Sequence, residues 1–203
     1  MADPLLETSI TPPTGPLPSE LWTLGHSSRT WEEFLALLQS QSIAYVVDVR
    51  RFAGSRKYPQ FGQDQLAPAL AAENIGYRMI EELGGRRKPR DDSPNTLWRH
   101  PSFRAYADHM TTAEYRDGRA QLLQQACDRR TAVLCSEAVW WRCHRSMIAD
   151  DLKAAGVQVL HIMSATKTVE HPYTAPASVE NGMLRYGPAV SEPGTEPATS
   201  SKT

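Results

Sequence analysis

The stretch TAVLCSEAVWWRCHRSMIADDL, residues 131–152, decides the fold because it joins a predicted strand to a predicted helix through a polar segment. Residues 131–135 form a short apolar run of the kind that fills a buried strand. Met147, Ile148 and Leu152 then recur at helical spacing and predict an amphipathic helix. A strand that leads into a helix in this way is the repeating unit of an α/β domain.

The same alternation extends outward in both directions. Further strands are predicted at four apolar runs, 21–25, 44–49, 75–80 and 157–162. Thr30 and Glu33 form a capping box that opens a helix between the first two strands. Other helical patterns cover residues 64–73, 102–110 and 113–129. Helices between strands require crossover connections, so we expect a mostly parallel open sheet with helices on both faces, a Rossmann-like three-layer arrangement.

Composition sets the boundaries of this domain. The chain has 203 residues, with 40% hydrophobic and 22% charged residues, which is typical of one globular domain of ordinary size. Five of its 15 prolines fall in residues 1–20 and five in residues 172–197. We therefore expect a disordered N-terminal tail at residues 1–20 and an α/β domain at residues 21–166. An extended arm is expected at residues 167–188, and a disordered C-terminal tail at residues 189–203.

Charge and cysteine content narrow the functional classes. The net charge of −1 predicts no global attraction to nucleic acid or to an anionic membrane, so any such binding would need a local basic patch. No apolar run approaches the roughly 18 residues of a membrane span. Three cysteines do not make a disulfide framework, and an odd number favours a reducing compartment. We expect a cytoplasmic protein without a membrane partner, and neither a cofactor nor an oligomeric state can be named.

Unusual polar residues follow the ends of the predicted strands. The first predicted strand leads into Gly25, His26 and Ser27, and the second leads into Asp48 and Arg50. Beyond the third strand lies Arg86, and the fourth leads into Cys135 and Glu137. The carboxyl ends of parallel strands meet at one edge of a sheet, and ligands of open α/β sheets bind there. These groups are therefore expected to converge on one site, although each alone is equally typical of an ordinary turn or a solvated loop.

Several of these groups are suited to binding an anion. The backbone N–H groups and hydroxyl of the Gly25–Ser27 turn, and the amides that open the helix at 143–146, are expected to face a negative charge. In addition to these backbone groups, four side chains are predicted to bind the ligand: Arg50, Arg86, Arg145 and Ser146. Asp48 is expected to orient an arginine or to hold a ligand hydroxyl.

The segment CSEAVWWRCHRS, residues 135–146, also permits thiol chemistry. Cys143 is expected in the first turn of a helix, where free N–H groups and the helix dipole favour a thiolate. Nearby Arg142, His144 and Arg145 would favour it further. Cys135 is then a nucleophile or a resolving partner, and Glu137 a general acid or base.

Two other interpretations of this segment compete with the thiol interpretation. Cys135, Glu137, Cys143 and His144 could supply four zinc ligands, but their spacing departs from that of structural zinc sites. The adjacent side chains of Cys143 and His144 are also expected to diverge, so no metal is predicted. Alternatively, the cysteines are small packing residues, as we interpret Cys127 inside its helix.

Five segments together resemble one known family. They are TLGHSSRTWEEFLALL, VVDVRRFAGSRKYPQF, ELGGRR, FRAYADHM and CSEAVWWRCHRSMIADDL followed by GVQVLHI. In order and spacing they are similar to the family called domain of unknown function 488, over about residues 21–163. The resemblance maps a characteristic set of positions onto Gly25, His26, Ser27, Asp48, Val49, Arg50, Leu83, Gly84, Gly85, Cys135, Glu137, Cys143, His144 and Arg145. Because the biochemistry of that family is not established, the resemblance implies a fold and a site rather than a reaction.

A looser resemblance concerns layout alone. A strand ending in Cys135 and a helix opened by Arg145 and Ser146 look like the arrangement in rhodaneses and cysteine phosphatases, where a thiolate lies in an oxyanion cradle. The loop here is longer, and Arg142 falls one position late for a Cys-x5-Arg pattern.

The preferred hypothesis is an enzyme that binds an anionic ligand at the carboxyl edge of its sheet: a nucleotide, a phosphorylated metabolite or a nucleic-acid end. Its expected catalytic residues are Cys135, Glu137, Cys143, His144 and His26, with either histidine as proton partner. Two alternatives remain open. One is a non-catalytic nucleic-acid-binding module that uses the basic loops and the tryptophans. The other is a rhodanese-like sulfur-transfer or redox protein that uses Cys135 and Cys143.

Overall fold

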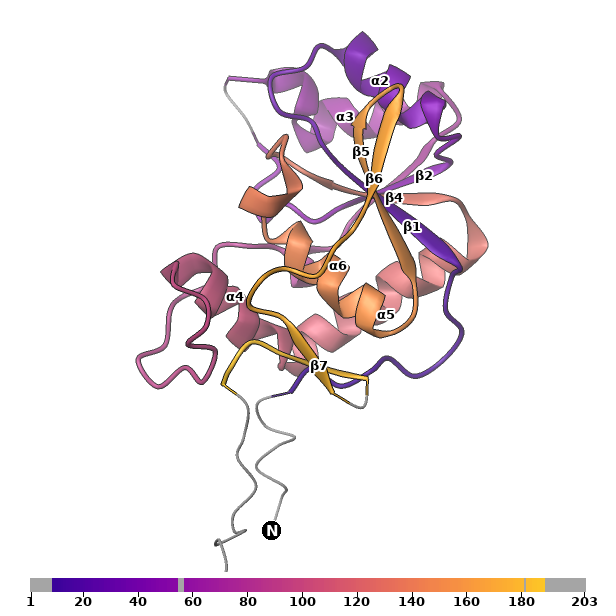
Figure 1. The fold of residues 1–203 in the computed structure, drawn as a ribbon. Helices are drawn as coiled ribbons and strands as arrows, with labels where there is room; N and C mark the ends of the chain where they lie inside the picture. The colour runs from indigo at the N-terminus through magenta and orange to yellow at the C-terminus, as the bar shows by residue number, and fades with distance from the viewer. Residues whose placement is uncertain (1–8, 55–56, 181, 189–203) are drawn as a thin grey trace, which may run out of the picture.

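A six-stranded sheet forms the centre of the molecule (Figure 1). The computed structural model describes residues 9–54, 57–180 and 182–188. In the order β3-β2-β4-β1-β5-β6, the strands are Gly76–Met79, Tyr45–Asp48, Thr131–Cys135, Glu20–Gly25, Gln158–Ser164 and Lys167–Glu170. The first five run parallel, and β6 pairs antiparallel with β5. The prediction of a mostly parallel sheet is confirmed.

Helices cover both faces of this sheet (Figure 1). One layer holds α2 (Trp31–Ser40) and α3 (Gln63–Ala72), and the other holds α4 (Pro101–Met110), α5 (Ala113–Asp128) and α6 (Arg145–Ala154). Short 3-10 turns, η1 (Pro59–Phe61), η2 (Glu81–Leu83) and η3 (Trp140–Arg142), lie in the loops between them. The predicted capping box opens α2, with the Glu33 N–H 3.2 Å from Thr30 Oγ1 and the Thr30 N–H 2.9 Å from Glu33 Oε2.

Strand β4 shows why the central strands are apolar throughout. Ala132 and Leu134 pack into the core beneath α2 and α3, whereas Val133 and Cys135 pack into the core beneath α4, α5 and α6. Successive side chains of a strand point to opposite faces, so a strand covered on both sides has no polar face. The last side chain of the strand, Cys135, is thereby placed on the α6 side at the carboxyl edge.

The segment after β5 forms an arm that is fastened to α6. Besides β6, it contains the hairpin of β7 (Ser178–Glu180) and β8 (Met183–Arg185). The buried carboxylate of Asp150 accepts hydrogen bonds from His171 Nε2 at 2.9 Å, Thr174 Oγ1 at 2.6 Å and Tyr186 OH at 2.9 Å. One buried acid therefore holds most of the arm in place.

Part of the expected N-terminal tail also lies against the domain. The N–H of Ile10 donates to the carbonyl of Leu184 at 2.9 Å, and both side chains are buried. Residues 9–19 thus follow a defined path, because the side chain of Ile10 in this proline-rich segment is buried in the core. Residues 1–8 and 189–203 of the predicted tails lie outside the described residues.

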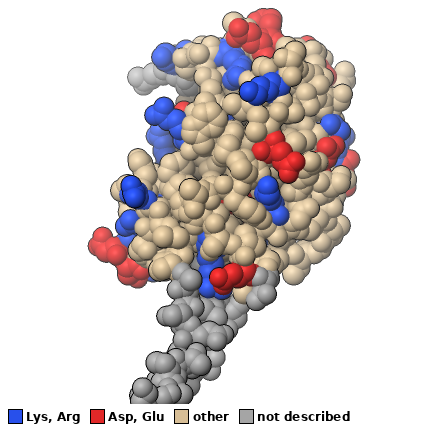
Figure 2. Space-filling model, viewed as in Figure 1, with Lys and Arg blue, Asp and Glu red and all other residues tan. Residues whose placement is uncertain are grey.

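The surface mixes both signs of charge. Figure 2 shows basic and acidic side chains of the described residues interspersed over one face of the molecule. Within the described part of the chain, the helices are too short and too polar for any of them to cross a lipid bilayer.

Candidate active site

A pocket of about 620 Å³ opens at the carboxyl edge of the sheet, beyond β2 and β4. Its lining comes from the loops that follow β2, β3 and β4, from the start of α4 and from the turn before α6. This is the location predicted from the strand-end residues, where ligands of open α/β sheets bind.

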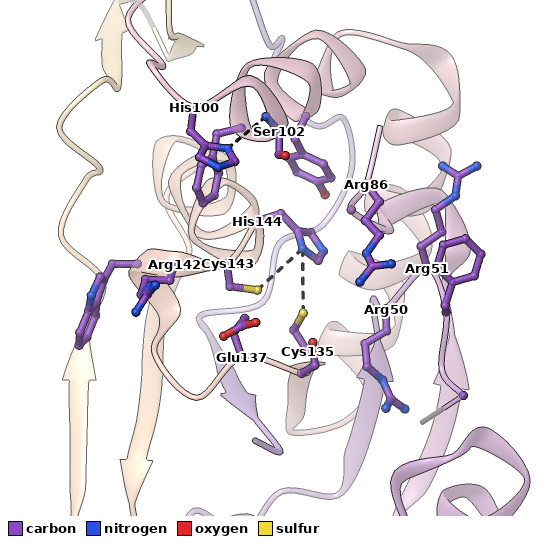
Figure 3. A pocket seen from close by; sticks show the side chains of 17 residues that line it. Arg50, Arg51, Arg86, His100, Ser102, Cys135, Glu137, Arg142, Cys143 and His144 are labelled. Carbon is purple, nitrogen blue, oxygen red and sulfur yellow. Dashed lines mark hydrogen bonds between the residues drawn. The ribbon is translucent and has the colours of Figure 1, made fainter. Parts of the chain in front are cut away.

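Two sulfur atoms and one imidazole ring form the floor of this pocket (Figure 3). Cys135 ends β4, and Cys143 and His144 lie directly before α6. Nδ1 of His144 is 4.0 Å from Sγ of Cys135 and 3.8 Å from Sγ of Cys143. On the other side of the ring, Nε2 is 3.2 Å from the carbonyl oxygen of Val49. A carbonyl only accepts hydrogen bonds, so Nε2 carries a proton and faces Val49, while Nδ1 faces the two sulfurs.

The two thiols have opposite tendencies to ionise. A hydrogen bond from Cys143 lowers the pKa of Cys135 well below its usual value, and His144 and Arg145 lower it further. Burial raises the pKa of Cys143 well above its usual value, and the neighbouring Cys135 adds to this. Within the pair, ionisation is therefore favoured at Cys135 over Cys143.

The same three residues form a potential metal-binding group. One ligand atom from each of Cys135, Cys143 and His144 lies within 4.8 Å of the others. The expectation that the Cys143 and His144 side chains diverge is therefore wrong. Cys143 has an extended backbone whereas His144 has helical dihedrals, and this change of direction brings the neighbours together. Two sulfurs and one imidazole are a donor set that zinc accepts, and the Val49 carbonyl would orient the imidazole.

The local backbone before α6 differs from the expectation in one respect. Cys143 does not lie in the first turn, because α6 begins at Arg145. Its N–H donates to the carbonyl of Trp140 at 3.1 Å, and the N–H of Ser146 donates to the carbonyl of Cys143 at 3.0 Å. These amides are used within the turn and are not available to a ligand.

Two glycines permit the close packing around the site. A Cβ atom on Gly25 would lie 1.7 Å from the backbone oxygen of Glu137, and one on Gly85 would lie 2.9 Å from Nδ1 of His144. Neither position has room for a side chain. At these two glycines, the backbone of β1 and of the loop after η2 therefore lies directly against the site, with no side chain between them.

The turn after β1 braces the site without lining the pocket. The N–H groups of His26 and Ser27 donate to the carbonyls of Cys135 at 3.0 Å and Ser136 at 2.9 Å, so the expected anion-binding amides already have partners. The His26 ring stacks on Phe61 with centroids 4.4 Å apart. Burial, and then Arg50, lower the pKa of His26. The ring is therefore held neutral.

A buried ion pair holds Arg50 at the pocket wall. Nε of Arg50 lies 2.9 Å and 3.0 Å from the two carboxylate oxygens of Asp48, and Nη1 donates to the carbonyl of Phe61 at 2.8 Å. Tyr77 donates to the same carboxylate at 2.8 Å. Asp48 thus orients Arg50, which lines the pocket, while Asp48 itself does not.

Arg145 supports the loop after β4. Its side chain is only 1% exposed, and its two terminal nitrogens donate to the carbonyls of Glu137 at 2.5 Å and Ala138 at 2.9 Å. Ser146 beside it is fully buried. Neither residue lines the pocket, whereas Glu137, which Arg145 positions through its backbone, does.

Free positive charge surrounds the sulfur pair. Arg51 and Arg86 lie on one side of it and Arg142 on the other (Figure 3). All three are exposed, and none lies within 4.0 Å of a carboxylate among the described residues. Of the described residues that line the pocket, Glu137 alone carries a carboxylate. The pocket is therefore cationic even though the whole chain is nearly neutral.

One wall of the pocket comes from a segment that the strand-end argument missed. His100, Ser102, Phe103 and Tyr106 belong to α4 and its cap, and no strand precedes them directly. The Tyr106 hydroxyl donates to the carbonyl of Leu83 at 2.8 Å, and its ring centroid is 4.9 Å from that of His144. The helix itself was predicted at 102–110, but nothing in its own pattern connected it with the site, and FRAYADHM was otherwise noted only as part of the family resemblance.

A family model described as Domain of unknown function DUF488 matches residues 30–152, from the N-cap of α2 to the last buried turn of α6. This is more than half of the chain, and it contains each of the loops that line the pocket. Among curated proteins and among solved structures, none matches the chain.

Proposed function

The chain belongs to the DUF488 family of domains of unknown function, and on that premise we propose that it is a cytoplasmic enzyme that binds an anionic ligand in this pocket and acts on it through the Cys135 thiolate. The proposed ligand is a nucleotide, a phosphorylated metabolite or a nucleic-acid end. One observation carries the proposal: a sulfur with a lowered pKa lies at the bottom of a pocket that exposed arginines surround.

The contacts of Cys135 support a role as nucleophile. A thiolate nucleophile is favoured by a neighbouring group that stabilises its charge and by a third group that orients that neighbour. His144 Nδ1 is 4.0 Å from the sulfur, and the Val49 carbonyl fixes the ring through Nε2. Glu137 is proposed as the general acid that protonates a leaving group.

The unpaired arginines support an anionic ligand. A guanidinium group binds phosphate or carboxylate oxygens through two parallel hydrogen bonds. Arg51, Arg86 and Arg142 are free of carboxylate partners within the described chain and surround one cavity. An anion in the pocket would neutralise charge that the protein itself leaves unbalanced.

Two exposed aromatic rings favour nucleotides among the possible anions. Phe52 is 66% exposed and Trp141 is 53% exposed, and both line the pocket. A nucleotide base can stack on either ring, so these two rings give the pocket an apolar surface that a simple phosphate would leave unused.

The proposed compartment follows from the thiols. Cys127, Cys135 and Cys143 are all free in the structure, and a thiolate of lowered pKa keeps its reactivity where the surroundings are reducing.

Calorimetric titration with three probes tests the ligand class: adenosine triphosphate, glucose 6-phosphate and a 5′-phosphorylated single-stranded oligonucleotide. We expect at least one probe to bind, and the double variant Arg86→Gln, Arg142→Gln to bind it about tenfold more weakly for each arginine removed. Arg116→Gln is the matched control, because Arg116 is exposed on α5 and does not line the pocket. Equal affinity in the double variant and the control contradicts the proposal.

A further inference from the structure

Cys135 and Cys143 are close enough to exchange a covalent bond. Both sulfurs contact the same imidazole nitrogen, and the three atoms lie within 4.8 Å of one another. One sulfur ends a strand and the other lies in the extended turn before α6. Both are nearly buried, at 5% and 4% exposure, so each is the nearest thiol that the other can meet.

We propose that this pair exchanges with anionic disulfides of small thiols, with Cys135 as the attacking sulfur and Cys143 as the resolving sulfur. The inference rests on the proposed function, because it uses the same nucleophile and the same cationic pocket, and it goes beyond that function by naming a reaction and a further class of anionic substrate.

The surroundings of the two sulfurs assign these roles. Both sulfurs contact Nδ1 of His144 and line the pocket, and the lowered pKa of Cys135, caused by Cys143, His144 and Arg145, favours Cys135 as the attacking sulfur. The pKa of Cys143 is raised by burial and by charge on Cys135. Once Cys135 has reacted, its charge is gone and one of the two causes that keep Cys143 protonated disappears. The first step therefore activates the second.

The bonds and protons balance over two steps. The Cys135 thiolate attacks a disulfide R–S–S–R, a Cys135–S–R bond forms, the R–S–S–R bond breaks and one RS⁻ leaves. Cys143 then gives its proton to Nδ1 of His144, which lies 3.8 Å from its sulfur, and attacks Sγ of Cys135. The second RS⁻ departs with that proton. The protein is oxidised to a Cys135–Cys143 disulfide, and the small disulfide is reduced by two electrons to two thiols.

The cationic pocket selects the charge of the disulfide. Exposed Arg51, Arg86 and Arg142 attract anions to the mouth of a pocket whose floor is Cys135, whereas a cationic disulfide would be repelled. Carboxylate-bearing disulfides such as glutathione disulfide therefore fit both the charge and the chemistry.

The experiment uses the full chain with Cys127→Ser, which removes the exposed third thiol. The reduced protein is incubated with glutathione disulfide, quenched in acid and mapped by mass spectrometry without reduction. We expect a Cys135–Cys143 disulfide with two molecules of glutathione released per chain. With Cys143→Ser added, the reaction should stop at a mixed disulfide on Cys135. With Cys135→Ser instead, Cys143 should remain unmodified.

Other results overturn the assignment. A mixed disulfide on Cys143 in the Cys135→Ser protein would reverse the roles, and no reaction in any of the three proteins would exclude the exchange. Cystamine, a cationic disulfide, should react at least about tenfold more slowly than glutathione disulfide. Equal rates would remove the selection by charge.

Metal analysis of the purified protein completes the test. One zinc ion per chain, lost when Cys135 or Cys143 is changed to serine, would make the sulfurs metal ligands and overturn the proposal. Titration of the Cys135→Ser protein with the phosphate probes separates this inference from the proposed function. If anions still bind while no exchange occurs, only the disulfide chemistry fails.

Discussion

At the scale of single residues, His144 connects the parts of the site. Its imidazole ring contacts two sulfurs through one nitrogen and the Val49 carbonyl through the other. The sequence predicted that the loops after β2, β3 and β4 would converge, because strand ends meet at one edge, but it wrongly predicted that the side chains of Cys143 and His144 diverge. It did not show that the amides of His26 and Ser27 are used by neighbouring carbonyls, because such pairing depends on how closely two loops approach.

Replacing His144 should change how Cys135 reacts with pH. His144 is one of the causes that lower the Cys135 pKa, so His144→Ala should move the pH midpoint of Cys135 alkylation upward. The measurement is alkylation by iodoacetamide between pH 5 and 10 with quantification of the Cys135 peptide. His100→Ala is the matched control, since His100 lines the pocket without contacting either sulfur. An unchanged midpoint in His144→Ala would show that the imidazole does not stabilise the thiolate.

At the scale of elements, apolar runs and capping signals located the five parallel strands and the helices. The antiparallel strands β6, β7 and β8 could not be assigned in the same way. They are only three or four residues long, and most of their side chains are exposed, so they lack the alternation that marks a half-buried strand. The arm is held instead by hydrogen bonds from His171, Thr174 and Tyr186 to Asp150 on α6. Partners so far apart in the chain leave no local pattern in the sequence.

The junction between β1 and the loop after β4 should tolerate no side chain. Gly25→Ala would place a Cβ atom 1.7 Å from the Glu137 carbonyl oxygen, and the two elements would have to separate. We expect a loss of about 1–3 kcal/mol in the free energy of unfolding, measured by urea denaturation. Gly54→Ala is the control, because Gly54 also lines the pocket but a Cβ atom added there would meet nothing within 4 Å. Equal stability of the two variants would refute this account of the junction.

At the scale of the whole molecule, a chain of hydrogen bonds crosses the core from the sheet to the arm. Thr23 Oγ1 lies 2.7 Å from His161 Nδ1, His161 Nε2 lies 2.9 Å from His171 Nδ1, and His171 Nε2 lies 2.9 Å from Asp150 Oδ1. Burial, and then His171 and Arg145, lower the pKa of His161 from 6.5 to about 2. The folded chain therefore keeps this imidazole neutral.

Stability should consequently fall in mild acid. Between pH 6.5 and 5 the unfolded chain binds a proton at position 161 that the folded chain excludes, so lowering the pH favours unfolding. His161 alone contributes a slope of up to about 1.4 kcal/mol per pH unit, and the lowered pKa values of His26 and His109 act in the same direction. Urea denaturation across this range measures the slope, and His161→Gln should reduce it. A free energy of unfolding that stays level or rises toward pH 5 would contradict the conclusion that His161 is neutral in the folded chain.

The pairing of Ile10 with Leu184 has a mechanical consequence. Because these residues pair antiparallel, the chain before Ile10 and the chain after Leu184 leave the bridge at the same end. A force that pulls residues 9 and 188 apart would therefore first load this bridge together with the hydrogen bond from Tyr186 to Asp150. Once both have broken, the tension reaches the parallel sheet directly through β1, because residues 11–19 alone separate Ile10 from that strand.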